Sequence, residues 1–151
     1  MRLALLLHLL GVVVWVGGMF FAYMALRPAA AQLLQPPQRL TLWAGTFKRF
    51  FPWVWVSVGL IFASGTYLIL TAGGFGAAPL YVDGMLLVGL VMAVIFLRIV
   101  FFPYRDLTRA VEGSDWQAAG AALAQIRTLV GVNLILGMLN IVVAMVGGLF
   151  A

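Results

Sequence analysis

Four long apolar runs set the narrowest limit on what this chain can fold into. They cover about residues 3–26, 52–71, 81–102 and 128–150, and each is close to the roughly 20 apolar residues that a helix needs to cross a bilayer. Only 9% of the 151 residues are charged, whereas a soluble domain has roughly 25%. The sequence therefore predicts an all-α integral membrane protein, a single transmembrane domain over residues 1–151 built as an up-down-up-down four-helix bundle.

The basic residues predict how this bundle is oriented. Eight of the nine Lys and Arg flank or occupy the two longer loops, and only Arg2 lies on the opposite side. The eight are Arg27, Arg39, Lys48, Arg49, Arg98, Arg105, Arg109 and Arg127. Because cytoplasmic loops carry the excess of Lys and Arg, we expect an inner-membrane protein with both termini in the periplasm, N-out and C-out.

The loop before the second run has a helical pattern of its own. Apolar side chains recur at Leu40, Trp43, Phe47 and Phe50 beside basic residues, which predicts a short amphipathic helix lying at the cytoplasmic interface. The second span is then expected to begin at Pro52.

Two further signals concern the later helices. Pro103 is expected to stop the third span. Ser114 with Gln117 resembles a capping box, which predicts a new helix that runs into the fourth span.

His8 is the only histidine, and it lies about five residues inside the outer end of the first span. A titratable side chain at that depth is costly unless it is paired, ligated or directed into the bundle. The favoured interpretation is a metal or cofactor ligand. The alternative is a neutral imidazole that hydrogen-bonds a neighbouring helix.

Residues at the depth of His8 supply possible partners. In an up-down-up-down bundle these are Thr66 or Tyr67, Met85 or Leu86, and Met145. Imidazole and thioether groups suit copper(I) and also serve as axial haem ligands, so His8, Met85 and Met145 form the predicted metal site. Trp15 shares the helical face of His8 and either flanks a flat cofactor or packs. Core filling is the alternative for the methionines.

Two stripes of small or polar residues predict helix contacts. Asn133, Gly137, Asn140 and Ala144 form a stripe on the fourth span that is typical of interhelical hydrogen bonding. Gly11, Gly18 and Ala22 form a small-residue strip on the first span that is suited to close helix contact, and a homodimer across this strip is one expectation.

Several function classes find no support in the residues. The chain has no cysteine, so a thiolate metal site or a cysteine nucleophile is excluded. It also lacks a P-loop and a Ser/His/Asp arrangement. The basic residues are dispersed at helix ends rather than gathered on one face, so we expect no nucleic-acid partner.

The motifs resemble a known family. His8, Trp15, Gly17-Gly18-Met19 and then Leu26-Arg27-Pro28 resemble the opening helix of the CopD copper-resistance group. The stretches Phe47-Lys48-Arg49-Phe50-Phe51, Pro103-Tyr104-Arg105 and Val132-Asn133-Leu134 are similar too. This resemblance implies copper handling, usually inferred as uptake across the inner membrane.

The arrangement of spans also resembles the related HemJ group, which binds haem b and acts in protoporphyrinogen oxidation. Its opening-helix histidine would match His8. Its third-helix lysine has no counterpart here, where the sequence reads Tyr81-Val82-Asp83-Gly84-Met85.

Three functions are therefore expected, in this order. The first is a copper-handling membrane protein, with transport as one form of that role. The second is a b-type haem protein in electron transfer or porphyrin oxidation, with His8 as axial ligand, and only this one would be an enzyme. The third is a structural subunit without a cofactor. The predicted partners are the lipid bilayer, a copper ion or haem, and a second copy of the chain.

Overall fold

A computed structural model describes residues 1–149, so Phe150, the predicted end of the fourth span, lies outside the described residues. The described part is helical and contains no strand. Its elements are α1 (Arg2–Phe21), a π-helical turn η1 (Ala22–Leu26), α2 (Arg27–Leu33), α3 (Pro36–Thr71), α4 (Leu80–Phe101), α5 (Pro103–Glu112) and α6 (Trp116–Gly147). They join into four helical units that are long and apolar enough to span a membrane, which confirms the predicted fold class.

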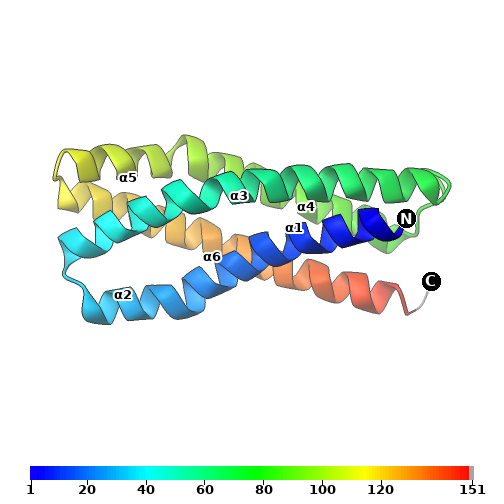
Figure 1. Cartoon of the computed structure of the whole chain (residues 1–151), viewed down its shortest axis with the longest axis horizontal. Coiled ribbons are helices and arrows are strands. Elements are labelled where there is room, and N and C mark those ends of the chain that lie inside the picture. Colours follow the sequence, from blue (N-terminus) through cyan, green and yellow to red (C-terminus); the bar gives the residue numbers. More distant parts are fainter. Residues whose placement is uncertain (150–151) are drawn as a thin grey trace.

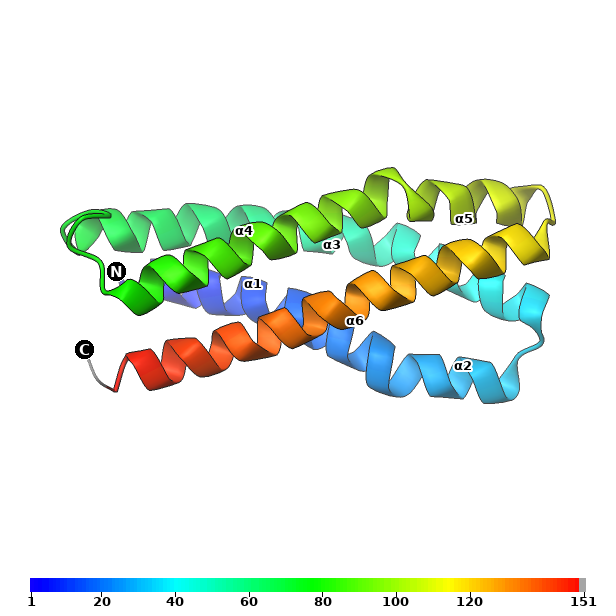
Figure 2. The ribbon, with the colours of Figure 1, turned by 180° about the vertical axis from the view of Figure 1, so that it is seen from behind.

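The four units run antiparallel along one long axis (Figures 1 and 2). The ends marked N and C lie at one end of the bundle, which we call the terminal end, together with the connection between α3 and α4 (Figure 1). The connections from α2 to α3 and from α5 to α6 lie at the other end, which we call the hairpin end (residues 27–50 and 98–127). The bundle is therefore up-down-up-down, as expected.

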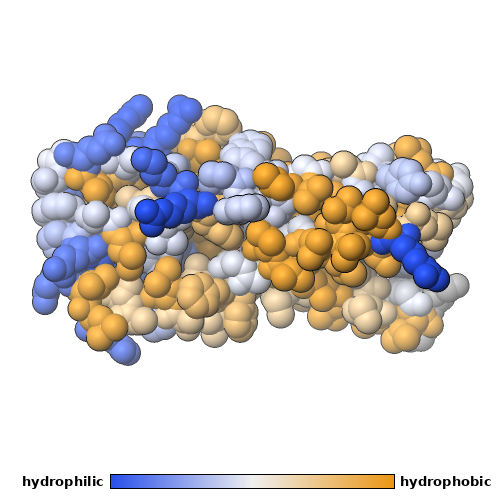
Figure 3. Space-filling model, viewed as in Figure 1, coloured by the Kyte–Doolittle hydropathy of each residue, from blue (hydrophilic) through white to orange (hydrophobic). Residues whose placement is uncertain are grey.

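The helices are longer than a bilayer is thick. The units have 32 to 36 residues, or about 48 to 54 Å at 1.5 Å per residue, against a hydrocarbon core of about 30 Å. In Figure 3 hydrophilic residues gather at the hairpin end, while apolar surface covers the part toward the termini. The predicted spans are thus the apolar portions of longer helices, and the hairpin end extends beyond them.

Pro28 follows the first apolar run, where a proline usually marks the end of a helix, but it does not end the first helix. The helix passes through η1 into α2, and the amide of Arg27 bonds the carbonyl of Ala22, five residues back. Proline lacks an N–H and its ring collides with the preceding turn of an α-helix. A wider π turn immediately before Pro28 accommodates that ring while the chain stays helical.

The prediction of a separate short helix lying at the membrane interface is wrong. Residues 40–50 belong to α3, which continues through Pro52 to Thr71. The apolar stripe does not face a membrane surface, because Leu40, Trp43 and Phe47 are buried in the same core cluster as residues of α5 and α6. The helical spacing of the apolar residues was predicted correctly, but their apolar face packs against other helices of the same chain.

The breaks around α5 follow the local sequence. α4 ends at Phe101, and Pro103 begins α5, so Pro103 ends the third span as predicted. The cap of α6 differs from the prediction: Asp115, not Ser114, is the N-cap, and its Oδ1 accepts from the amide of Ala118 at 3.0 Å. Ser114 instead makes the turn, with φ of 56°. The helix does run directly into the fourth span.

The small-residue strip of α1 lies against α3. A Cβ at Gly11 would come within 2.8 Å of Ile61 Cγ1, and one at Gly18 would collide with the Phe50 ring. Close contact at the strip is therefore confirmed. Because α3 of the same chain already occupies it, the homodimer expected across this strip has no free surface there.

Candidate functional site

His8 lies in α1 with its imidazole half-buried against α3. Its Nδ1 is 3.1 Å from the carbonyl oxygen of Ile61 and 3.1 Å from the hydroxyl oxygen of Ser64. Gly65 leaves room for the ring, because a Cβ there would stand only 3.2 Å from His8 Cε1. Ile61, Ser64 and Gly65, which lie on about one turn of α3, thus hold the imidazole in place.

These contacts decide which imidazole nitrogen carries the proton. The Ser64 hydroxyl donates to the carbonyl of Leu60, and the carbonyl of Ile61 can only accept. Both neighbours of Nδ1 therefore act as acceptors, and Nδ1 is the donor. In a neutral imidazole the lone pair then resides on Nε2, the nitrogen left to bind a metal or accept a proton.

On α3, the residues that lie beside His8 differ from those predicted to lie at its depth. Thr66 and Tyr67 were expected at this level, but both are exposed, and the imidazole meets Ile61, Ser64 and Gly65 instead. The reason is that α3 extends past the start of α1 at the terminal end (Figure 1). Counting inward from each helix end therefore selects residues too close to that end.

Trp15 is in the bundle core, about two helical turns from His8 along α1. It is 3% exposed, and its ring packs edge-on against Phe96 of α4 at 6.2 Å between centroids. Beside it lies a cavity of about 140 Å³ with an almost wholly apolar lining, which we call the mid-bundle cavity. Met19 is buried on the same face, so the face shared by His8, Trp15 and Met19 points into the bundle.

The two methionines predicted as ligands lie on other helices. Met85 of α4 is half-buried, and Met145 of α6 is 70% exposed. The hydrogen bonds of His8 within residues 1–149 go to α3 alone. Of the two thioether side chains, Met145 faces away from the bundle interior and Met85 is the more buried. The described residues also contain no group of three His, Cys, Asp or Glu side chains able to hold a metal.

The polar stripe of α6 bonds α4, as predicted. Asn133 and Asn140 each donate from Nδ2 to a main-chain carbonyl of α4, those of Met92 and Met85, over 3.2 Å. Gly137 between them leaves space for Val16 of α1 and for Met92. The interhelical hydrogen bonds expected from the sequence are confirmed.

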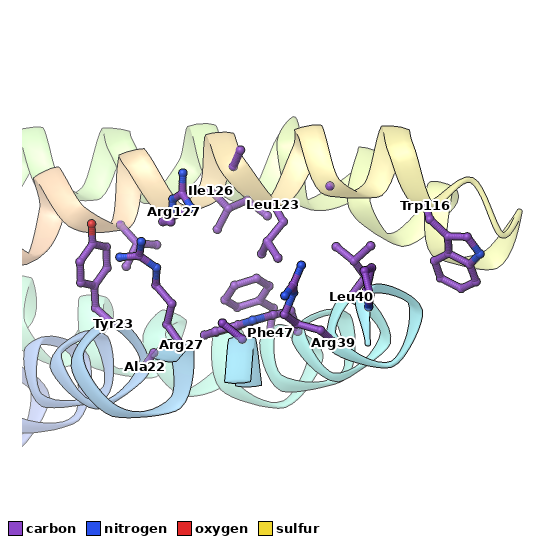
Figure 4. Close-up of a pocket in the computed structure, with 16 residues that line it drawn as sticks. Ala22, Tyr23, Arg27, Arg39, Leu40, Phe47, Trp116, Leu123, Ile126 and Arg127 are labelled. Atoms are coloured by element: carbon purple, nitrogen blue, oxygen red, sulfur yellow. The ribbon is translucent and has the colours of Figure 1, made fainter. Parts of the chain in front are cut away.

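A larger cavity at the hairpin end was missed by sequence reasoning. It has a volume of about 420 Å³ and lies between η1, α2, α3 and α6. Arg27, Arg39 and Arg127 line it, and the first two extend from α2 and α3 toward α6 (Figure 4). We call it the arginine cavity. The sequence had presented these residues as markers of orientation, and only their convergence in the folded bundle reveals a site.

Fold and composition define a class: a multi-pass helical membrane protein. The model of the copper resistance protein D family, CopD, matches residues 44–147, which is more than half of the chain. The chain therefore belongs to the CopD family, whose description links it to copper resistance. The match begins within α3 and does not include His8. Comparisons with curated proteins and with solved structures gave no match.

Proposed function

We propose that this CopD-family protein handles copper as its cargo and that Nε2 of His8 binds the ion. One observation carries the proposal: Nδ1 is engaged by two acceptors on α3, so the lone pair is on Nε2. A metal-ligating histidine characteristically donates its other ring N–H to such an acceptor, which fixes the ring and its tautomer. The family's link to copper resistance supports copper as the metal.

We propose thioether groups as further ligands. Imidazole with thioether favours copper(I) over harder cations. Met85, near the start of α4, and Met145, near the end of α6, lie toward the same end of the bundle as His8. Met85 is half-buried and Met145 is 70% exposed. We therefore expect Met85 to contribute more to retained copper than Met145.

The core beneath His8 supports capture at one membrane face. Trp15 and Met19 are buried directly below it, and the mid-bundle cavity has an almost wholly apolar lining. A charged ion crossing such a region would be costly. Transport through the bundle, as opposed to capture and transfer at the face, would require the helices to open.

We further propose that His8 is on the periplasmic side of the inner membrane. The distribution of basic residues supports this orientation, because the hairpin end carries eight of the nine Lys and Arg and the terminal end carries Arg2. His8 would then meet copper arriving from outside the cytoplasm.

Metal analysis combined with a visible absorption spectrum of the purified protein tests this function. The proposal predicts a protein without a Soret band that takes up copper(I) in a fixed ratio to the chain. A Soret band would instead assign His8 to the haem alternative. Protein that takes up neither would point to the structural subunit. One copper per two chains would favour a homodimer through a surface other than the strip on α1.

A further inference from the structure

We propose that the arginine cavity binds an anionic amphiphile. Its phosphate or carboxylate group would lie among Arg27, Arg39 and Arg127, and its apolar part would point toward the bundle centre. This inference concerns the opposite end of the bundle from His8 and does not depend on the copper role.

The charge of the cavity lining is of one sign. Sixteen residues line it, three of them are arginines, and none is Asp or Glu. Arg27 and Arg39 are half-buried, so their guanidinium groups are partly removed from water without a carboxylate in the lining to compensate. Guanidinium groups bind phosphate and carboxylate through paired N–H donors. An anion is therefore the ligand that this lining favours.

Aromatic side chains shape the cavity around that charge. Trp43, Phe47 and Trp116 line it, and the guanidinium of Arg27 lies 4.9 Å from the centre of the Tyr23 ring. A cation placed over an aromatic face is held in position before any ligand arrives. The cavity volume of about 420 Å³ is within the range of about 300–1,000 Å³ that is usual for small-molecule sites.

An apolar space adjoins the arginine cavity on the membrane side. The mid-bundle cavity shares Ala22, Phe47 and Val130 with it, so the two are adjacent. Its other lining residues include Phe51 and Phe96. Charge at the hairpin end followed by apolar lining toward the centre is the polarity of an amphiphile with its head at the membrane boundary.

Depth also favours a membrane-derived ligand. Arg27 directly follows the first apolar run, and Arg127 directly precedes the fourth. Because the apolar runs end at these positions, we place them at the level of lipid phosphate groups, where basic pockets between helices bind anionic headgroups.

Native mass spectrometry of the full chain in detergent tests the proposal with three probes. Phosphatidylglycerol and oleate represent the two sources, a phospholipid and a free fatty acid, and phosphatidylcholine serves as the uncharged comparison. We expect one molecule of phosphatidylglycerol or oleate per chain, bound in preference to phosphatidylcholine. Whichever of the two binds more tightly identifies the source. Equal retention of phosphatidylcholine, or displacement of the bound lipid by millimolar inorganic phosphate, would overturn the proposal.

Arginine variants connect such binding to the cavity. Arg27→Gln and Arg39→Gln should each weaken it roughly tenfold or more, since each removes a charge-assisted contact. Arg49→Gln is the matched control, because Arg49 is exposed at the hairpin end and does not line the cavity. Equal effects of all three variants would show that only general surface charge attracts the lipid.

A second variant fills the cavity without changing its charge. Gly120 lines the arginine cavity, and a Cβ there would have no atom within 4 Å, so Gly120→Leu should occupy the space while the bundle stays folded. Gly45→Leu is its control, since Gly45 is equally open but outside the lining. Loss of lipid with Gly120→Leu alone supports the proposal. Unchanged binding in a folded Gly120→Leu protein contradicts it.

Discussion

Asn133 of α6 donates its side-chain amide to the main-chain carbonyl of Met92 on α4 over 3.2 Å, in the buried centre of the bundle. Seven residues further along, Asn140 makes the same bond to Met85, seven residues earlier on α4. The two bonds are therefore successive rungs between antiparallel helices, and together they define the register of α4 against α6. They also set the height of Met85 in the half of the bundle that holds the termini.

Replacing Asn133 should weaken the bundle measurably. Asn133→Ala removes one rung and leaves a small void at a side chain that is 1% exposed, so we expect the free energy of unfolding to fall by about 1 kcal/mol. Unfolding in mixed micelles measures this change, with Ile135→Ala, at a side chain 61% exposed, as control. Equal stability of the two variants would show that the rung does not fix the register.

Gly137 should tolerate no larger side chain. A Cβ there would lie 2.9 Å from Val16 Cγ2 and 3.1 Å from Met92 Cε, so Gly137→Ala must displace the Met92 side chain and push the short, branched Val16 of α1 away from α6, at the cost of about 1–3 kcal/mol. Gly45→Ala meets no atom within 4 Å and should be neutral or stabilising by up to about 1 kcal/mol through helix propensity. Both free energies come from the same unfolding assay. A stabilised Gly137→Ala protein would contradict the three-helix contact.

Fluorescence quenching distinguishes the buried stripe of α3 from an interfacial helix. Trp43 is 7% exposed, whereas Trp53 is 63% exposed. In variants that keep one tryptophan each, brominated lipid should quench Trp53 strongly, and neither brominated lipid nor acrylamide should quench Trp43 well. Strong quenching of Trp43 by lipid would restore the interfacial helix that the sequence alone predicted.

Reporter fusions test the orientation. Alkaline phosphatase fused after Leu149 should be active, because this end is expected in the periplasm, and the same enzyme inserted at Ser114 should be inactive. Fluorescent protein fusions at both positions should give the reverse pattern. Activity at Ser114 with inactivity after Leu149 would place His8 on the cytoplasmic side.

Much of the fold could be predicted because membrane helices are read from local properties. Run length determines the four spans, and the seven-residue spacing of Asn133 and Asn140 placed them on one face that bonds a neighbouring helix. The sequence was less informative at helix ends. Pro28 and Pro52 usually mark boundaries, but a π turn absorbs the first and core packing retains the second inside α3.

The sites were harder to predict because they depend on relative helix heights. Ser64 becomes the partner of His8 because α3 extends beyond α1, an offset that no local pattern records. The arginine cavity likewise needs α2, α3 and α6 to continue past the apolar runs and converge. In the sequence, Arg27 and Arg127 indicated only the orientation of the bundle. In the folded bundle they also line a cavity.

Copper(I) affinity of the His8→Leu protein tests the central claim most directly. Competition against a chromogenic copper(I) chelator gives the affinity, and unfolding in the same detergent verifies that each variant is intact. Ser64→Ala, Met85→Leu and Met145→Leu complete the series, since they alter the Nδ1 acceptor or a thioether while leaving Nε2 in place. We predict that His8→Leu abolishes binding in a folded protein, that Ser64→Ala weakens it by roughly tenfold, and that Met85→Leu weakens it more than Met145→Leu. Wild-type copper affinity in folded His8→Leu protein would contradict the account.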